Sequence, residues 1–465
     1  MGLRRILALA AGKISIALLR ALGRGATTAP GRVVLWLDSA FVRYLARDAR
    51  RVRAVVTGTN GKTTTAALLE SMMDGFGWEV LRNSSGSNML PGIASAMAEV
   101  ARFPGRLSVD AVVAEVDEAT MPRLVEEMAP EVAVVTNFFR DQLDRYGELD
   151  HTVSYVREGL AGIRRAACLN VDDPLVAGLM DTLPAGVEPI TFGFDPLPEN
   201  RREDDAEVGG LDTQFCPRCG ERFQYRTRNY GHLGDYSCPG CGWSRPEREV
   251  VGVQLPGSGG SVRMRLEFAG GESIEVTLAI RGAYNAYNAV AAAAAARVAG
   301  VGPAAIKEGL EDFGGAFGRM ERLNVGGREV VLALSKNPVG FNQILRAVLD
   351  DAEAGSLVVG INDNLADGRD ISWLWDVDFE LLAETENLPV VVTGTRAEDM
   401  AVRLKYGGVE TSSVEIEGQG GSALKRAVDL CPGGRRVYAL LTYTAMLDLR
   451  GELQRRGLVR EMWRG

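Results

Sequence analysis

Short apolar runs that alternate with longer helical stretches set the pattern of this chain. The run Val52–Val56 has the length of a strand, the stretch Gly58–Lys62 predicts a turn, and Thr63–Phe76 predicts a helix. Further apolar runs at Ala111–Ala114 and Val132–Val135 are separated by helical stretches. Strands that alternate with helices favour a mostly parallel sheet, so we expect an α/β fold.

The same pattern returns in the second half of the chain after two interruptions. A charged, irregular stretch, Glu199–Asp205, leads into a cysteine-containing segment, and alternating strands resume from about Val250 to Leu278. A helix rich in small residues is predicted at Asn285–Ala299, and the glycine-rich stretch Phe313–Gly318 has the composition of a hinge. Strands of a second α/β unit, which begins near Val325, are predicted at Val330–Leu334, Leu357–Ile361, Val390–Thr393 and Val437–Leu441.

This organisation predicts three parts. We expect an N-terminal helical segment at residues 1–48, a central domain at 49–320 and a C-terminal α/β domain at 321–465, with the cysteine segment inserted at about 212–246. A chain of 465 residues is too long for one ordinary core and suits two or three domains.

The N-terminus, from Met1 to Arg24, has a basic start and an apolar middle, as a signal peptide does. Lys13 interrupts the apolar run, however, and no run reaches the roughly 18 apolar residues that a membrane span needs. A helical stripe fits better, formed by Leu3, Leu7, Ile14, Leu18 and Leu22. We therefore expect an amphipathic helix that packs on the body of the protein or lies near a membrane surface.

Charge and cysteine usage narrow the class of protein. The formal net charge is −9, whereas a nucleic-acid-binding protein usually shows a basic face. Six cysteines are present, four of them in two Cys-x-x-Cys pairs, which indicates a cytosolic protein with a metal site rather than a secreted disulfide framework. The remaining two, Cys168 and Cys431, are predicted to be buried structural thiols.

The strongest chemical signal follows the first predicted strand. This signal is the turn Gly58–Lys62, whose glycines let backbone N–H groups approach phosphate oxygens. The helix that follows the turn adds a favourable dipole. Lys62 can reach the β and γ phosphates of a nucleotide, and Thr63 can hold Mg²⁺. We expect Lys62 to face solvent; the alternative is an ordinary strand-to-helix turn. The predicted nucleotide-binding residues of this loop are Gly58, Thr59, Asn60, Gly61, Lys62, Thr63 and Thr64.

The two Cys-x-x-Cys pairs predict a zinc ribbon. Each short turn aims two thiolates at one point, and four thiolates complete a tetrahedron with no open position, so the site is expected to be structural. A redox pair and a nucleic-acid-binding ribbon are the alternatives. His232 is expected at the surface, because four thiolates suffice. The predicted zinc ligands are Cys216, Cys219, Cys238 and Cys241.

The loop Gly-Thr-Asn-Gly-Lys-Thr-Thr resembles the Mur ligase and folylpolyglutamate synthase superfamily, whose members activate a carboxylate as an acyl phosphate with ATP. Glu115 resembles the superfamily's Mg²⁺-binding glutamate, and Asn285 the asparagine that contacts the nucleotide base. Further resemblances, in the superfamily's order, are Thr136-Asn137 with Asp141-Gln142-Leu143-Asp144, Asn170 with Asp172-Asp173-Pro174, Gly282-Ala283-Tyr284-Asn285 with Asn288, and Gly318-Arg319-Met320-Glu321.

Two departures argue against an enzyme that adds an amino acid. Many Mur ligases carbamoylate a lysine of the central domain to bridge a second Mg²⁺, but residues 63–306 contain no lysine. The stretch Ala333–Gln343 also differs from the Asp-Tyr-Ala-His-x-Pro strand end of those ligases.

The inserted four-cysteine ribbon and the Lys336–Gln343 stretch instead resemble the MurT family, the ligase subunit of lipid II isoglutaminyl synthase. The stretches Asn362–Asp376 and Thr442–Met446 are similar to that family too. The resemblance implies a cytoplasmic enzyme, either free or peripheral at the inner face of the membrane, that amidates the α-carboxylate of D-glutamate in lipid II. It implies ATP, Mg²⁺ and Zn²⁺ as cofactors, and ammonia from a partner glutaminase of the GatD family.

The sequence supports this division of labour independently. Releasing ammonia from glutamine needs a cysteine nucleophile with a histidine base. The chain has only two histidines, His151 and His232. Cys168 has no glycine elbow, and Cys431, in Asp-Leu-Cys-Pro-Gly-Gly, has no histidine near it in sequence. The resemblance implies that an aspartate of the C-terminal domain completes the partner's catalytic site, and Asp370 and Asp376 are the candidates; capping a helix or facing water is the alternative for either.

The expected mechanism places Lys62 and Glu115 among the catalytic residues and Arg319 at the hinge beside the nucleotide. Lys62 and a Mg²⁺ held by Thr63 and Glu115 would offset charge as the carboxylate attacks the γ-phosphoryl group. Closure about Gly314–Arg319 would keep water from the acyl phosphate. Two other functions stay open at this point: a stand-alone Mur or folylpolyglutamate-type ligase, and a zinc-ribbon ATPase that binds nucleic acid.

Overall fold

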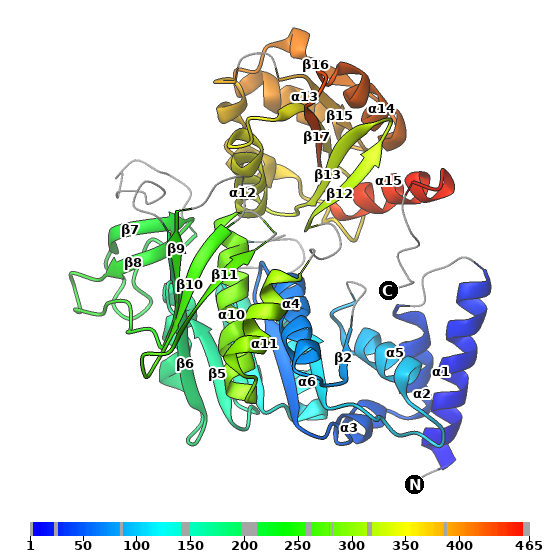
Figure 1. Ribbon diagram of the computed structural model, residues 1–465, viewed down its shortest axis with the longest axis vertical. Coiled ribbons are helices and arrows are strands. Elements are labelled where there is room, and N and C mark those ends of the chain that lie inside the picture. The colour runs from blue at the N-terminus through cyan, green and yellow to red at the C-terminus, as the bar shows by residue number, and fades with distance from the viewer. Residues whose placement is uncertain are drawn as a thin grey trace. The chain divides into compact units, whose positions relative to one another are not determined.

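The structure is a computed structural model, and its chain divides into two compact units. It describes residues 3–22, 27–83, 87–140, 149–196, 212–256, 262–278, 280, 282–313, 319–385 and 388–458. The first unit spans most of residues 1–314, and the second spans residues 315–465 with two short segments, 140–148 and 280–282. Each unit is built around its own sheet (Figure 1).

The first unit contains a nine-stranded sheet in the order β11-β10-β9-β6-β5-β4-β1-β3-β2. Neighbours from β2 to β9 pair in parallel, whereas β9, β10 and β11 pair antiparallel. The strands are β1 Val52–Thr57, β2 Val80–Arg82, β3 Ala111–Glu115, β4 Val132–Val135, β5 Ala166–Asn170, β6 Glu188–Asp195, β9 Val250–Leu255, β10 Val262–Phe268 and β11 Ser273–Leu278. The predicted parallel sheet is therefore confirmed, with an antiparallel extension at one edge.

Helices cover both faces of this sheet because its central strands are apolar on both sides. Val55, Val112 and Ala133 belong to one core with α5, α6 and α8, and α4, α10 and α11 pack together against the strands as well. The helices are α1 Leu3–Ala21, α2 Ala29–Leu37, α3 Phe41–Ala46, α4 Lys62–Gly75, α5 Leu90–Val100, α6 Met121–Met128, α8 Leu149–Leu160, α9 Pro174–Gly178, α10 Ala283–Ala299 and α11 Pro303–Glu311, with 3-10 turns η1 Glu118–Thr120 and η2 Leu179–Thr182.

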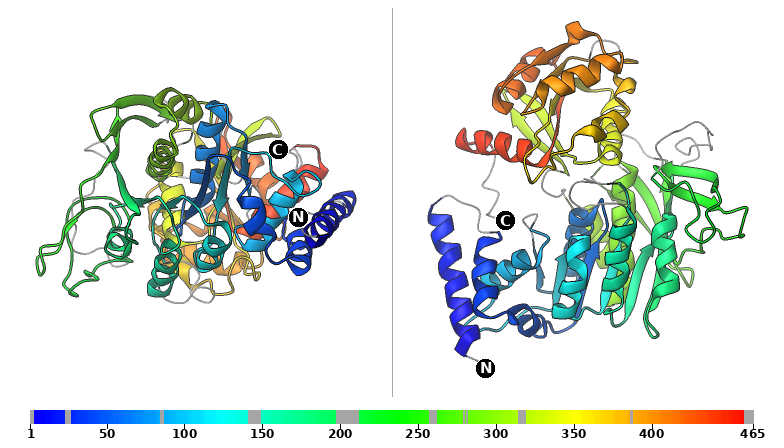
Figure 2. Two further views of the ribbon diagram at one scale, coloured as in Figure 1. Left: turned by 90° about the horizontal axis from the view of Figure 1, so that it is seen from below. Right: turned by 180° about the vertical axis from the view of Figure 1, so that it is seen from behind.

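The N-terminal segment forms the predicted helix, and α1 packs on α2 and α5 at the edge of the first unit (Figure 2). It packs through Ala8, Leu9, Gly12 and Ile16. The predicted apolar stripe, Leu3 to Leu22, lies on the opposite side, and its members are 53–71% exposed. No helix among the described residues has the length and hydropathy of a membrane span.

The cysteine segment forms a small antiparallel hairpin of its own, β7 Gln224–Tyr230 and β8 Leu233–Ser237, between β6 and β9. A cluster of buried aromatic side chains, Phe223, Tyr225 and Tyr236, packs around the cysteines together with Val171 and Ala177 of the main body. The predicted inserted ribbon is present, and its apolar core is continuous with the first unit. The charged stretch Glu199–Asp205 lies outside the described residues.

The second unit is a three-layer α/β domain with a six-stranded sheet in the order β12-β13-β17-β14-β15-β16. Only β12 and β13 pair antiparallel. Helices α12 and α13 share one core, and α14 and α15 share the other. The elements are β12 Arg319–Val325, β13 Arg328–Leu334, α12 Pro338–Leu349, β14 Ala354–Gly360, η4 Ser372–Asp376, η5 Phe379–Leu382, β15 Val390–Thr393, α13 Ala397–Tyr406, η6 Thr411–Ser413, β16 Val414–Ile416, α14 Gly420–Leu430, β17 Arg436–Leu441 and α15 Tyr443–Arg455.

All four strands predicted for this unit are confirmed within a few residues. The glycines predicted to form the hinge, Gly314 to Gly318, lie outside the described residues, and Arg319 is the first residue of β12.

Candidate functional site

A tight turn joins β1 to α4 and has the geometry of a phosphate loop. Gly58 and Gly61 adopt φ values of +117° and +88°, which favour glycine. A Cβ atom on Gly58 would lie 2.3 Å from Thr136 Oγ1, so the turn lies directly against the end of β4. The N–H groups of Thr59 and Asn60 donate to the backbone oxygen and the Oδ1 of Asn137, at 2.8 and 2.9 Å.

Lys62 is buried at the first turn of α4, where solvent was expected. Its residue is 6% exposed, and its Nζ donates to Gly58 O at 2.6 Å and to Glu118 Oε1 at 3.0 Å. Burial lowers the pKa of Lys62, but the carboxylates of Glu118, Asp117 and Glu115 more than offset this and raise it. The expectation of a solvent-facing lysine was wrong, because η1 places Glu118 over the loop.

Thr63 and Glu115, which the family resemblance pairs as Mg²⁺ ligands, meet beside the loop. Thr63 Oγ1 lies 3.0 Å from Glu115 Oε1. Glu115 is 4% exposed, and among the described residues its Oε2 has no hydrogen-bond partner. A buried carboxylate oxygen without a donor, beside a hydroxyl, fits a hard cation such as Mg²⁺.

Asn83 fixes the position of Glu115, and sequence reasoning missed it. Its Oδ1 accepts from Glu115 N at 2.8 Å, and its Nδ2 donates to Glu115 O at 2.8 Å. Asn83 follows the short strand β2, next to β3 in the sheet. The strand order was needed to find this contact.

The start of α10 forms a second wall of the loop. A Cβ atom on Gly61 would lie 2.0 Å from Asn288 Oδ1, so the helix and the loop touch. Asn288 and Asn285 are buried, and Asn288 Nδ2 lies 3.3 Å from Asn285 Oδ1. The structure thus brings Asn288 to the loop, and the predicted base-contacting Asn285 lies beside Asn288. The predicted motif at 141–144, Gln142 included, lies outside the described residues.

The strand end after β5 ties these parts together. Asn170 Nδ2 donates to Thr136 O at 2.8 Å, and Phe138 N donates to Asp173 Oδ2 at 2.7 Å. Asp173 also caps α9. Asp172 is fully buried, and Tyr287 of α10 donates a hydrogen bond to it at 2.6 Å.

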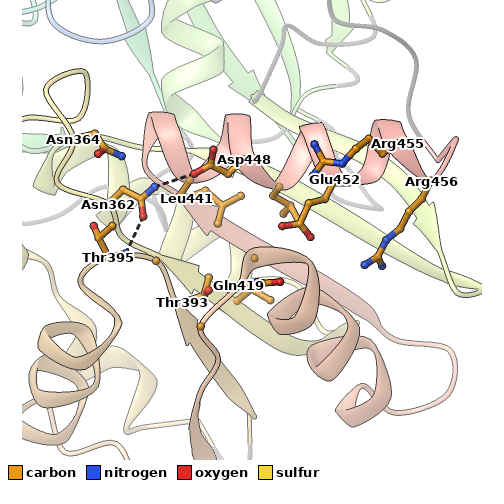
Figure 3. Close-up of a pocket in the computed structure, with 16 residues that line it drawn as sticks. Asn362, Asn364, Thr393, Thr395, Gln419, Leu441, Asp448, Glu452, Arg455 and Arg456 are labelled. Atoms are coloured by element: carbon orange, nitrogen blue, oxygen red, sulfur yellow. Dashed lines mark hydrogen bonds between the residues drawn. The ribbon is translucent and has the colours of Figure 1, made fainter.

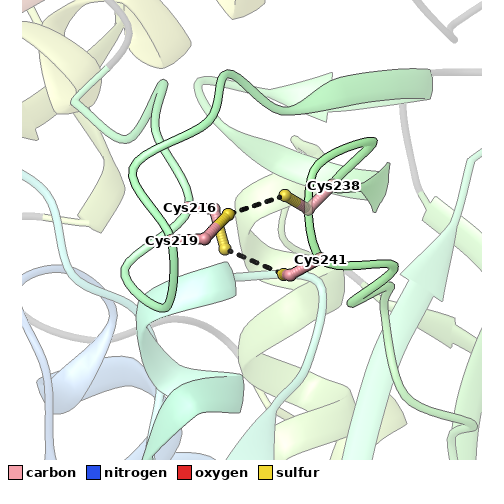
Figure 4. A group of neighbouring side chains, drawn as sticks. All are labelled: Cys216, Cys219, Cys238 and Cys241. Carbon is pink, nitrogen blue, oxygen red and sulfur yellow. Dashed lines mark hydrogen bonds between the residues drawn. The ribbon is translucent and has the colours of Figure 1, made fainter.

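The four cysteines of the ribbon converge, as Figure 4 shows. Their Sγ atoms all lie within 4.8 Å of one another. Cys216 Sγ lies 3.7 Å from Cys241 Sγ, and Cys219 Sγ lies 3.4 Å from Cys238 Sγ. Four thiols gathered in this way can hold one metal ion, and the donor set suits zinc.

His232, at the tip of the ribbon hairpin, is fully buried, so the expectation of a surface position was wrong. Its Nε2 lies 3.2 Å from Asp173 Oδ2, and its ring centroid lies 4.6 Å from that of Phe139. Burial lowers the pKa of His232, but Asp173 more than offsets this and raises it. The hairpin folds back onto the body here, which spacing along the chain does not reveal.

Phe139 connects the ribbon to the phosphate loop. Its N–H donates to Thr59 Oγ1 at 3.0 Å, and Thr59 Oγ1 lies 3.1 Å from Phe139 O. Asn229 of the hairpin also donates to Tyr287 of α10. The ribbon therefore contacts residues that support both walls of the loop.

In the second unit, the loops after β14 and β17 are pinned to each other. Asp367 is buried and accepts hydrogen bonds from the N–H and the hydroxyl of Thr444, and Asn362 Nδ2 also donates to Thr444 Oγ1 at 2.9 Å. Burial raises the pKa of Asp367. The candidates Asp370 and Asp376 follow Asp367 in the sequence, and both are exposed. The N–H of Ser372 donates to Asp370 at 2.8 Å and lowers its pKa.

A cavity of about 690 Å³ lies beside these loops, at the carboxyl ends of β14, β15 and β17. Figure 3 shows Asn362 between Thr395 and Asp448, at one side of the cavity. Neither Asp370 nor Asp376 lines it.

The chain is similar to known proteins over almost its whole length. Residues 56–232 match the Mur ligase middle domain, and residues 334–446 match the MurT ligase C-terminal family. The fold of this chain also superposes on the solved structure of MurF ligase from Thermotoga maritima in complex with ADP, with a TM-score of 0.59. The two sequences are 17% identical, and the superposition covers 90% of this chain and 84% of the MurF chain.

Two curated relatives carry the same description. Subunit MurT of the glutamine-hydrolyzing lipid II isoglutaminyl synthase of Streptococcus pneumoniae is 35% identical over 99% of both chains. Subunit MurT of the corresponding synthase of Staphylococcus aureus (strain COL) is 32% identical over 84% of this chain and 85% of its own. This chain therefore belongs to the MurT family of Mur-type ligases.

Proposed function

We propose that this chain is the ligase subunit of a lipid II isoglutaminyl synthase. It would activate the α-carboxylate of D-glutamate in lipid II as an acyl phosphate, and ammonia from a glutaminase partner would displace the phosphate. The full-length similarity to MurT subunits carries this proposal. The lysine-free span from residue 63 to 306 is consistent with it, because it leaves no lysine for the carbamoylation seen in many amino-acid-adding relatives.

The phosphate loop supports ATP as the energy source. Gly58 to Thr64 would hold the phosphates, with Asn285 near the base and Arg319 at the start of the second unit. Lys62 is charged and held at the loop, so it can neutralise charge that develops on the transferred phosphoryl group. Thr63 and Glu115 would hold Mg²⁺, which supplies further charge neutralisation when bound.

The ribbon would hold one structural Zn²⁺ through its four cysteines. Four thiolates leave no position for a substrate, so the ion would stabilise the fold rather than take part in the reaction. This agrees with the position of the ribbon, whose hairpin supports the phosphate loop through His232 and Phe139.

The partner would be a glutaminase of the GatD family, in a heterodimer or a larger assembly. Cys168 and Cys431 are both buried, as predicted, and burial raises the pKa of each thiol, so neither is suited to act as a nucleophile. Asp370 or Asp376 would orient the partner's catalytic histidine. Both are exposed, and Trp375 between them is 55% exposed, as suits an interface.

The reaction is tested with the purified pair of subunits, lipid II, ATP and glutamine. We expect mass spectrometry to show one carboxylate of lipid II converted to an amide, with no product when ATP is withheld. Incorporation of an amino acid instead of ammonia would overturn the proposal in favour of a stand-alone ligase.

The two aspartates are tested separately with Asp370→Asn and Asp376→Asn. One variant should lose glutamine hydrolysis while the subunits still co-elute, and Asp378→Asn, on the same segment, serves as the control. If both variants hydrolyse glutamine normally, this chain contributes no residue to the partner's catalytic site.

We place the enzyme in the cytoplasm, peripheral to the inner face of the membrane. ATP is a cytoplasmic substrate, and a lipid-linked glutamate is presented at the membrane surface. Fractionation of cells should find the chain partly with membranes and released from them by salt.

A further inference from the structure

Helix α1 leaves a continuous apolar face uncovered. Five large aliphatic side chains line it at helical spacing, and each is more than half exposed: Leu3 71%, Leu7 53%, Ile14 59%, Leu18 60% and Leu22 70%. Between them the same face carries mainly alanines. We call these five residues the α1 stripe. Isolated exposed leucines are ordinary, but a contiguous row along a whole helix marks an interaction surface.

The way α1 packs explains why this face stays outside. The helix approaches α2 through small residues, since a Cβ atom on Gly12 would lie 2.6 Å from Val34 Cγ2 and 3.2 Å from Ala98 Cβ. Ala8 and Leu9 are fully buried in the same contact. The side of the helix that carries Gly12, together with Leu9 and Ile16, is thus used for the body of the protein, and the α1 stripe is left for another surface.

The segment that carries the stripe has charges of one sign only. The first 37 residues contain no aspartate or glutamate, although the chain as a whole carries a net charge of −9. Arg4 is exposed at the start of the helix, and Arg32 is exposed on α2. Arg20 pairs with Glu99 of α5, and even with this one charge neutralised the segment stays basic. The basic residues are Arg4, Arg5, Lys13, Arg20, Arg24 and Arg32.

We propose that the α1 stripe is a docking surface for an anionic lipid bilayer, on which α1 lies flat. An apolar face on a helix whose own charged residues are all basic is the chemistry that a negatively charged membrane surface takes. The inference deepens the proposed function, because it places the enzyme on the surface that presents its lipid-linked substrate.

The geometry suits a helix that lies on the membrane rather than one that crosses it. Nineteen residues give a helix of about 28 Å, but only one side is apolar and free, and the other is committed to α2 and α5. The large apolar side chains would enter the boundary between headgroups and acyl chains. The arginines would stay at the headgroups and give the binding its dependence on salt.

Vesicle flotation of the full-length chain, co-purified with its glutaminase, tests this. Wild-type protein should float with phosphatidylglycerol vesicles, bind far less to phosphatidylcholine vesicles, and bind less as salt rises. The variant Leu7→Gln/Leu18→Gln should lose at least about tenfold in vesicle affinity, since each side chain gives up the transfer of a leucine from water.

A matched control is available on the second unit. Val402 and Ile416 are 47% and 53% exposed, so Val402→Gln/Ile416→Gln removes similar apolar area away from α1 and should float like wild type. Thermal unfolding of both double variants should match wild type, because none of the four side chains is buried.

Three results would overturn the proposal. One is equal flotation of wild type and the α1 variant. Another is a wild-type protein that does not bind vesicles but forms a dimer, which the α1 variant does not form; a second copy of the chain would then cover the α1 stripe. The third is loss of the glutaminase from the α1 variant, which would make the partner the occupant. Flotation needs no turnover, so a failure of the proposed amidation would show separately, as vesicle binding without product.

Discussion

Replacing Lys62 with Ala should remove activity and also destabilise the first unit. The Lys62 and Glu118 side chains are 7% and 6% exposed and lie 3.0 Å apart. The substitution leaves the Glu118 carboxylate buried without its cation. It also removes the donor to Gly58 O, so the loop loses its internal support along with the group that would contact phosphate.

The size of the effect follows from burial. Breaking a buried ion pair by removing one partner costs about 3–5 kcal/mol, because the other charge stays in a medium that solvates it poorly. Removing both charges together costs far less. We therefore expect Lys62→Ala to lower the free energy of unfolding by about 3 kcal/mol, and Lys62→Ala with Glu118→Gln to recover most of that loss.

Urea unfolding and amidation assays on the same preparations separate the two effects. Lys62→Ala should be inactive and destabilised, and the double variant should be inactive but close to wild-type stability. Lys307→Ala is the control, because Lys307 pairs with Glu311 on the surface of the same unit and should contribute less than about 1 kcal/mol. Wild-type stability in Lys62→Ala would refute the reasoning about the ion pair, and near-normal turnover would remove the phosphate-loop assignment.

Three further outcomes are expected. Chelating the metal of the ribbon should weaken binding of a fluorescent ATP analogue, because His232 supports the loop through Phe139. The expected loss of affinity is on the order of fivefold, which corresponds to the free energy of about one hydrogen bond, and unchanged affinity would contradict this. Gly61→Ala should lower the same affinity more than Gly77→Ala lowers it, since both have positive φ but only Gly61 faces a neighbour within 4 Å. Burial and Glu70 raise the pKa of Asp74 to about 6, so ionisation of Asp74 lowers the free energy of unfolding as pH rises from about 4 through 6. Because Asp74 is exposed, Asp74→Asn should raise the free energy of unfolding by at most about 1 kcal/mol at pH 8 and should leave it unchanged at pH 4. Urea unfolding at the two pH values measures that difference.

Local patterns predicted the strand, turn and helix that form the phosphate loop, because the loop is one continuous segment. Glu115 was paired with Thr63 through the family resemblance, and the two side chains meet because β1 and β3 are neighbours in the sheet. Strand boundaries followed from apolar runs, since strands buried on both faces need no alternation. The antiparallel edges, β10 and β11 in the first unit and β12 in the second, departed from the expected parallel sheets.

Contacts made by residues far apart in the chain could not be predicted in this way. Glu118 covers Lys62 from a 3-10 turn 56 residues away, and nothing in its neighbourhood marks it as an ion-pair partner. His232 was assigned to the surface by counting zinc ligands, which says nothing of where the hairpin tip lands. It lands on Phe139 and Asp173, whose positions depend on the order of β4 and β5 in the sheet.

The N-terminal helix shows how periodicity can identify an element and still leave its packing face open. A stripe of large apolar residues ordinarily marks the buried side of a helix. In α1 the buried side instead holds Ala8, Leu9, Gly12 and Ile16, and Gly12 lets the backbone approach α2 closely. Close approach depends on small residues, and a hydrophobicity pattern gives them little weight. When one face of a helix carries a glycine at the point of closest approach, that face can pack against its own protein, and a row of large apolar side chains on the other face is then available to another surface.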